Sequence, residues 1–116
     1  MNLSYFRDYC LSKVGASEDT PFDSDTLCFR VGARIFSICT ISNFDFVNLK
    51  CDPERAAELR EQFPGITSGY HMNKKTWNSV SVIGNVPDKL ILELVDHSYD
   101  LILASLSKKV QAEIRP

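Results

Sequence analysis

Three β-rich runs between Thr26 and Lys50 restrict the fold of this chain more than any other feature. They read TLCFRV, ARIFSICTI and FDFVNLK, and only Gly32 and the dipeptide Ser42-Asn43 separate them. Their β-branched and aromatic residues favour strands. Connections this short join antiparallel strands, because a parallel pair needs a crossover of about a dozen residues. The segment therefore predicts three consecutive antiparallel strands.

The position of Gly32 also predicts how two arginines are placed. If the first turn is centred on Gly32, Arg30 and Arg34 stand two residues to either side of it and project from the same face of the sheet. Two neighbouring arginines repel each other unless an anion lies near them. The pair therefore predicts an anion-binding point; the alternative is that each arginine pairs with an acid elsewhere, as isolated surface arginines commonly do.

Helical spacing of apolar residues occurs on both sides of these strands. Residues 3–14 place apolar side chains three or four positions apart, and Gly15 follows as a stop. The segment CDPERAAELREQF begins a second helix with Asp52 as N-cap and Pro53 at the first helical position. The longest helix is predicted over residues 86–106, VPDKLILELVDHSYDLILASL, and should be the main helix packed on the sheet.

The remaining segments complete an α+β pattern. Residues 16–25 are acidic and predict an exposed loop, residues 76–83 (TWNSVSVI) predict a further strand, and residues 108–116 predict a basic tail that frays. Helices and strands do not alternate strictly, as they would in a parallel α/β fold, and this order favours an α+β fold. We expect one domain over residues 1–116: an antiparallel sheet with N-terminal and C-terminal helices packed on one face. The other face is then exposed or covers a partner.

Composition and the cysteines exclude several classes of protein. The chain has 116 residues, of which 44% are hydrophobic and 24% charged, as in an ordinary globular domain. It contains no long apolar segment of the kind that spans a membrane and no signal peptide, so we expect a cytoplasmic protein without a membrane partner. The four cysteines are 18, 11 and 12 residues apart. This spacing predicts reduced, buried side chains and neither a metal site nor a redox pair.

Residues suited to catalysis are few. The sequence contains no GxGxxG, P-loop, HExxH or GxSxG motif. His71 and His97 are its only histidines and lie far apart along the chain. We therefore expect a protein without cofactor or metal that is not an enzyme.

Positive charge is concentrated outside the predicted helices. The net charge is −2, but residues 26–50 hold three bases and one acid, and residues 66–86 hold two bases and no acid. The acids belong to the helices and the first loop. If helices and strands form separate layers, the sheet side is mildly basic and suited to weak, salt-dependent contact with phosphate. The stretch GYHMNKKTWNSV, residues 69–80, adds aromatic rings and amides to two lysines.

Four phrases together resemble the MmcQ/YjbR family of small bacterial proteins. They are GARIFSI, LKCDPERAAELREQFPGI, GYHMNKKTWNSV and VDHSYDLILASLSKK, and the similarity runs from about Tyr5 to Lys109. The resemblance implies a frataxin-like (CyaY-like) α+β fold and DNA binding through a double-wing arrangement of strands. The chain departs from the family pattern at Thr76, where the family has a second histidine, and at Ser68, where it has a proline. A metal role that needs both family histidines is therefore doubtful here.

These observations give a nucleic-acid-binding hypothesis, with DNA as the first expectation. In it the basic side chains contact phosphates while rings and amides stack on or bond to bases. The expected contact residues are Arg30, Arg34, Tyr70, His71, Asn73, Lys74, Lys75, Trp77 and Asn78. For the two rings, Tyr70 and Trp77, packing within the protein is the alternative. A protein-interaction module is the alternative function, and frataxin-like iron binding through acids is a third.

Overall fold

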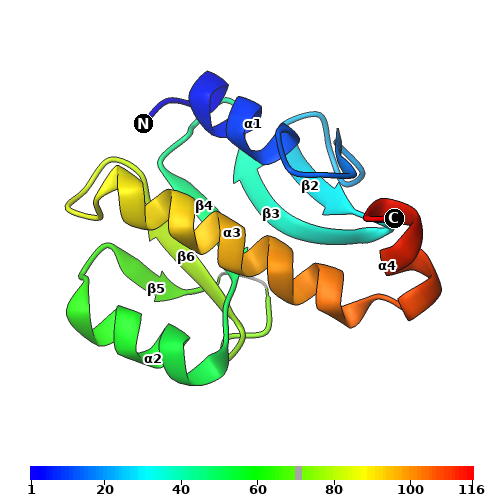
Figure 1. Cartoon of the computed structure of the whole chain (residues 1–116). Coiled ribbons are helices and arrows are strands. Elements are labelled where there is room, and N and C mark those ends of the chain that lie inside the picture. Colours follow the sequence, from blue (N-terminus) through cyan, green and yellow to red (C-terminus); the bar gives the residue numbers. More distant parts are fainter. Residues whose placement is uncertain (70–71) are drawn as a thin grey trace.

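One antiparallel sheet organises the molecule (Figure 1). A computed structural model describes residues 1–69 and 72–116, which form six strands in the order β1-β2-β3-β4-β6-β5 and four helices. In chain order the elements are α1 (Leu3–Leu11), β1 (Ala16–Asp19), β2 (Thr26–Val31), β3 (Arg34–Thr40), β4 (Phe46–Lys50), α2 (Pro53–Gln62), β5 (Ile66–Ser68), β6 (Trp77–Ser81), α3 (Asp88–Ser105) and α4 (Lys108–Ile114). The expected α+β class and the three antiparallel strands of residues 26–50 are confirmed.

Local signals explain where the second helix begins. The side chain of Asp52 accepts a hydrogen bond from the backbone N–H of Arg55, and Pro53 occupies the first turn, where it needs no hydrogen-bond partner of its own. The predicted start of this helix is therefore confirmed.

The helices α1, α2 and α3 pack on one face of the sheet. A row of cross-strand neighbours on this face runs from Phe29 through Ser37 and Leu49 to Asn78. Phe6 of α1 meets Phe29 edge to face with ring centroids 5.9 Å apart. Tyr99 of α3 meets Phe36 in the same way at 5.4 Å. Large buried aromatic rings stabilise a core strongly, so this face holds the protein together.

The expectation that Arg30 and Arg34 share a face is wrong. The turn between β2 and β3 contains two residues, Gly32 and Ala33, so Val31 lies opposite Arg34 and Arg30 lies opposite Ile35. The turn is therefore centred between Gly32 and Ala33. Side chains alternate between faces along a strand, and this centre places the two arginines on opposite faces of the sheet.

Two further segments differ from their predictions. The predicted loop at residues 16–25 begins with a strand, since Ala16–Asp19 pairs with β2 at the sheet edge, and Glu18 there accepts hydrogen bonds from Arg7 at 2.6–2.8 Å. The three-residue strand β5 was not predicted at all, and it pairs with β6. Both are short edge strands with few apolar residues, so pairing with a neighbour defines them more than composition does.

The predicted frayed tail forms the helix α4. Ser107 caps it, accepting a hydrogen bond from the backbone N–H of Val110 at 3.2 Å. The helix packs over two glycines that adopt positive φ angles. A Cβ atom on Gly15 would lie 2.8 Å from Ile114, which is closer than real Cβ contacts. Gly15 therefore provides both a turn and the space into which α4 fits.

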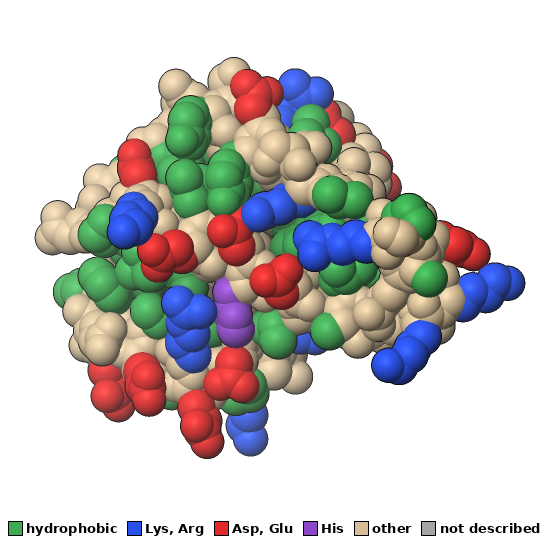
Figure 2. Space-filling view, in the orientation of Figure 1, with side chains coloured by type: hydrophobic (Ala, Val, Ile, Leu, Met, Phe, Trp, Pro, Cys, Tyr) green, Lys and Arg blue, Asp and Glu red, His purple; other side chains and the backbone are tan. Residues whose placement is uncertain are grey.

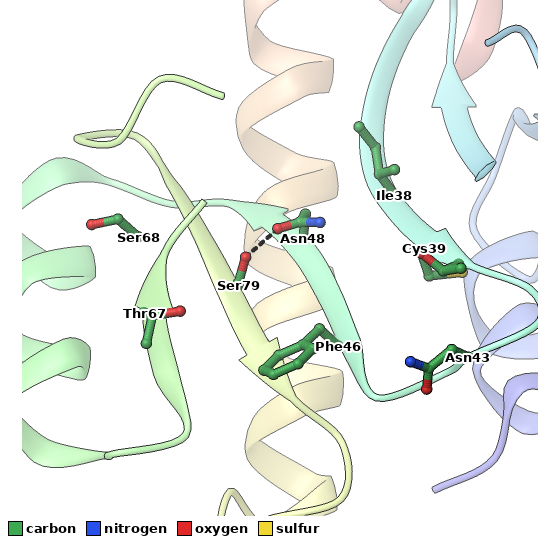
Figure 3. Close-up of a pocket in the computed structure, with 9 residues that line it drawn as sticks. Ile38, Cys39, Asn43, Phe46, Asn48, Thr67, Ser68 and Ser79 are labelled. Carbon is green, nitrogen blue, oxygen red and sulfur yellow. Dashed lines mark hydrogen bonds between the residues drawn. The ribbon is translucent and has the colours of Figure 1, made fainter. Parts of the chain in front are cut away.

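The second face of the sheet carries no helix among residues 1–69 and 72–116 (Figures 1 and 3). A row of cross-strand neighbours on this face runs from Cys28 through Ile38, Asn48 and Ser79 to Thr67. We call it the uncovered face. Within the described part of the chain, no helix has the length and apolar character that crossing a membrane requires.

Candidate functional site

The uncovered face places Lys50 and Trp77 directly opposite each other. Lys50 ends β4 and Trp77 begins β6, and the two strands pair in antiparallel register. Both side chains are half-buried. Directly opposed residues have Cβ atoms about 5 Å apart, so the side chains of Lys50 and Trp77 project from neighbouring positions on this face.

Acidic residues are scarce on the uncovered face and common on the helices. Across the six strands, all of which lie in the described part of the chain, the acid that projects from this face is Asp19, and it pairs with Arg30 at 3.0 Å. Figure 2 shows the opposite, helix-covered side, where acidic side chains gather over α2 and α3. Acids outnumber bases on α2 and α3, whereas on the uncovered face of the strands Arg30 and Lys50 outnumber Asp19.

A hollow of about 430 Å³ opens on the uncovered face between β3, β4, β6 and β5 (Figure 3). Most of the described residues around it have hydroxyl or amide side chains, and none of these described residues is charged. They are Ile38, Cys39, Thr40, Asn43, Phe46, Asn48, Thr67, Ser68 and Ser79. The α3 helix passes behind the strands in this view, so the hollow faces away from the helices.

One hydrogen bond fixes the polar centre of the hollow. The hydroxyl of Ser79 donates to Oδ1 of Asn48 at 2.5 Å (Figure 3). Ser79 is 8% exposed, whereas Asn48 is half-buried. Because its oxygen is held in this way, the Nδ2 amide group of Asn48 remains as a donor on the surface of the hollow. Phe46 is 49% exposed and forms one end of the same hollow.

The segment before β6 presents two lysines. Asn73 organises this turn: its side chain accepts the backbone N–H of Lys75 at 3.0 Å, and its carbonyl accepts the N–H of Trp77 at 2.9 Å. Lys74 and Lys75 are exposed. Asn73 thus shapes the turn through its oxygen atoms, as asparagine often does, and Thr76 alone separates the two lysines from Trp77.

Position 69 lies too close to Trp77 for any residue but glycine. The N–H of Gly69 donates to the carbonyl of Trp77 at 2.8 Å. A Cβ atom on Gly69 would lie 2.9 Å from the Cβ of Trp77 and 3.1 Å from its carbonyl oxygen. The chain at Gly69 therefore approaches Trp77 more closely than a side chain allows. The expected contact residues Tyr70 and His71, which follow Gly69, lie outside the described residues.

Asn78 does not belong to the exposed surface. It is 2% exposed and points to the helix-covered face. Its Oδ1 accepts a hydrogen bond from Arg60 of α2 at 2.7 Å, and its Nδ2 donates to the carbonyl of Ala56 at 3.3 Å. A side chain held in this way joins β6 to α2, so it is not available to a ligand at the surface.

The two arginines of the candidate set are also separated from the lysines. Arg30 is occupied by Asp19 and by the carbonyl of Ala33 at 2.8 Å. Arg34 donates to Ser105 at the end of α3 at 3.0 Å, on the other side of the sheet. Of the predicted set, the structure brings together Asn73, Lys74, Lys75 and Trp77.

Sequence reasoning missed the residues that complete this surface. They are Phe46, Asn48 and Lys50 on β4 and Ser79 on β6. The alternation in FVNLK was the available signal, because positions 46, 48 and 50 of a strand share one face. The signal gives no information on which face the helices cover.

The four cysteines are buried, and His97 is hydrogen-bonded within the fold. All four cysteines are free and buried, as predicted, and burial raises the pKa of Cys39 to about 12, which makes it a poor nucleophile.

His97 lies on α3, and its Nε2 accepts the backbone N–H of Asp52 at 3.1 Å. Burial, and then the charge of Arg55, lower the pKa of His97. Among residues 1–69 and 72–116, no group of three or more His, Cys, Asp or Glu could hold a metal ion.

The geometry defines a small α+β protein whose antiparallel sheet has helices on one face and a hollow on the other. The YjbR family model matches residues 11–101. The chain is 34% identical over 97 residues to the uncharacterized protein YbdF of Escherichia coli O157:H7, covering 83% of this chain and 80% of YbdF. It is 34% identical over 100 residues to the uncharacterized protein YjbR of Escherichia coli strain K12, covering 85% of each chain. The protein belongs to the YjbR family.

Two solved structures share this architecture. The crystal structure of a Deinococcus radiodurans protein with a DUF419 domain has a TM-score of 0.91 and 36% identity, covering 97% of this chain and 87% of that one. A crystal structure of a Pseudomonas syringae protein has a TM-score of 0.75 and 29% identity, covering 88% of this chain and 99% of that one. Both structures share the fold of this chain, and the DUF419 domain of the first supports the family assignment.

Proposed function

We propose that this protein is a nucleic-acid-binding protein, without catalytic activity of its own, that uses the uncovered face of its sheet. The observation that carries the proposal is the placement of Trp77 directly opposite Lys50, with Lys74 and Lys75 exposed just before the tryptophan. Lysines neutralise phosphates, and an indole ring stacks on bases without regard to sequence.

The distribution of charge supports this orientation. Acids outnumber bases on α2 and α3 and disfavour a polyanion on the helix-covered side (Figure 2). On the uncovered face, Lys50 ends β4, and the acid that projects from the strands is Asp19. With a net charge of −2, long-range attraction is small. Binding should therefore be weak and should fall steeply as salt is added.

Fluorescence gives a direct test, because Trp77 is the only tryptophan in the chain. Labelled single-stranded and duplex DNA are titrated at low and moderate salt, while anisotropy and Trp77 emission are recorded. The double variant Lys74→Glu/Lys75→Glu should lose most of the binding. Lys108→Glu/Lys109→Glu is the matched control, since it makes the same charge change on the exposed face of α4. Equal losses in both variants, or no binding at low salt, would refute the proposal.

A protein–protein contact is the second candidate function. Phe46 and Ile83 are 49% and 70% exposed. Phe46 lies opposite Ser81. Ile83 follows Ser81 by two residues, so both apolar side chains lie at the same end of the sheet. Exposed apolar side chains of this size suit a protein interface. Sedimentation of the purified protein tests self-association: a dimer that Ile83→Lys dissociates supports this candidate, and a monomer at high concentration opposes it.

The frataxin-like comparison remains a proposal about topology and supplies no function here. It rests on the antiparallel sheet with helices on one face. Calorimetry with ferrous iron tests the expectation of frataxin-like iron binding. Heat of binding would support it.

A further inference from the structure

We propose that the hollow on the uncovered face is a nucleobase subsite, so that the preferred ligand is a single strand and not a duplex. The inference rests on the proposed nucleic-acid function and names the part of the ligand that this face recognises. Its basis is the chemistry of the hollow in Figure 3, which has a volume of about 430 Å³. The described residues around it form a mostly polar, uncharged wall and include the exposed ring of Phe46.

The wall of the hollow matches the edge of a base. Bases are flat and uncharged, and they offer both hydrogen-bond donors and acceptors. The hollow supplies the hydroxyl of Thr67 and the Nδ2 donor of Asn48, whose orientation the bond to Ser79 fixes. A donor already held in place loses little conformational freedom on binding. Phosphate matches this wall less well than a base does, because none of the described residues around the hollow carries a positive charge.

Two rings on the uncovered face mark the path of a strand. Phe46 ends the hollow on one side, and Trp77 lies two residues beyond Ser79 on the other. Positions 46 and 50 of β4 are about 13 Å apart along the strand, and Trp77 lies opposite position 50. A chain of nucleotides lying along β4 and β6 therefore meets a ring, the hollow and a second ring beside Lys50. Successive unstacked bases on aromatic side chains are the usual mode of single-strand binding.

A duplex does not fit this arrangement. Its bases are stacked on one another and present only their groove edges. The hollow lies on a sheet face, where a base enters only after it leaves its stack. Duplex DNA should therefore contact the lysines alone, through its phosphates.

The experiment compares oligothymidine and oligoadenosine deoxynucleotides, an abasic oligomer and a duplex of equal length at low salt. Base-bearing single strands should bind about fivefold or more tightly than the abasic oligomer. Phe46→Leu and Asn48→Ala should remove that difference and leave abasic binding unchanged. Tyr5→Leu is the matched control, because it removes a ring that is 55% exposed on α1. Thr67→Val, which keeps the shape of an exposed side chain, replaces Asn48→Ala if that variant does not fold.

Two outcomes separate this inference from the proposed function. If the abasic oligomer or the duplex binds as well as the base-bearing strands while Lys74→Glu/Lys75→Glu still weakens binding, the subsite is refuted and nucleic-acid binding stands. Free thymidine and adenosine supply the second comparison, read from the backbone amide resonances of Asn48, Thr67 and Ser79. Shifts that saturate support the base subsite even if no oligonucleotide binds. No shift with either nucleoside refutes it.

Discussion

The Nε2 atom of His97 accepts the backbone N–H of Asp52 at 3.1 Å. This hydrogen bond ties the middle of α3 to the residue that caps α2. Only the neutral imidazole accepts a hydrogen bond, and both burial and the charge of Arg55 favour that neutral form. The link between the two helices therefore depends on the protonation state of one histidine.

Stability should fall as the pH falls below about 6.5, the ordinary pKa of histidine. The pKa of His97 in the folded protein is lowered, so the unfolded chain binds more protons between the folded pKa and about 6.5. The contribution of His97 is complete above this window and is lost across it. Urea unfolding at several pH values measures the effect. His97→Gln cannot titrate and should have a flatter pH profile than the wild type; identical profiles would contradict the assignment.

Gly69→Ala should destabilise the protein by about 1–3 kcal/mol. The added methyl group would lie 2.9 Å from the Cβ of Trp77, so the chain must shift. Gly84→Ala is the control, because the nearest atom to its Cβ is the Ser81 hydroxyl at 3.1 Å, a small group that can rotate. Urea unfolding followed by Trp77 emission reports both variants. Equal stability of the two would show that the contact with Trp77 does not restrict position 69.

Asn78→Ala should cost about 1–3 kcal/mol, because it leaves Arg60 and the carbonyl of Ala56 without their partner. A double-mutant cycle with Arg60→Ala should give a coupling energy of about 0.5 kcal/mol or more. DNA affinity of the folded Asn78→Ala variant should equal that of the wild type. If the variant lost DNA affinity but kept the stability of the wild type, Asn78 would contact DNA and would not serve as a link between β6 and α2.

Alkylation of the cysteines by iodoacetamide should be slow in the folded protein and fast in urea. All four are buried, and burial raises the pKa of both Cys39 and Cys51. The thiolate is the reactive form, so burial lowers both access and reactivity. Mass spectrometry counts the labelled residues over time. Rapid labelling of one cysteine under native conditions would indicate a local opening at that position.

Local patterns were enough for the elements whose signals lie in neighbouring residues. Asp52 and Pro53 mark the start of α2 within one turn of chain. The runs of β-forming residues between Thr26 and Lys50 and the apolar spacing of residues 86–106 were long enough to identify β2, β3, β4 and α3. The acid-free stretch before β6 correctly indicated an exposed pair of lysines. The family resemblance depended on phrases spread through the chain, and membership of the YjbR family was confirmed.

Tertiary structure decided what each side chain faces. Asn78 and Trp77 are adjacent in sequence, yet one holds α2 and the other lies on the uncovered face. Arg30 and Arg34 differ in face because the turn is centred between two residues. Residues 16–19 and 66–68 become strands only through their partners.

The sequence by itself determined the main elements, because backbone preference and apolar period act between near neighbours. The site needed the assembled sheet. The hollow collects residues from four strands, and α1, α2 and α3 cover only one of the two faces. Which face stays open depends on contacts between segments far apart in the chain, and those contacts leave no local pattern in the sequence.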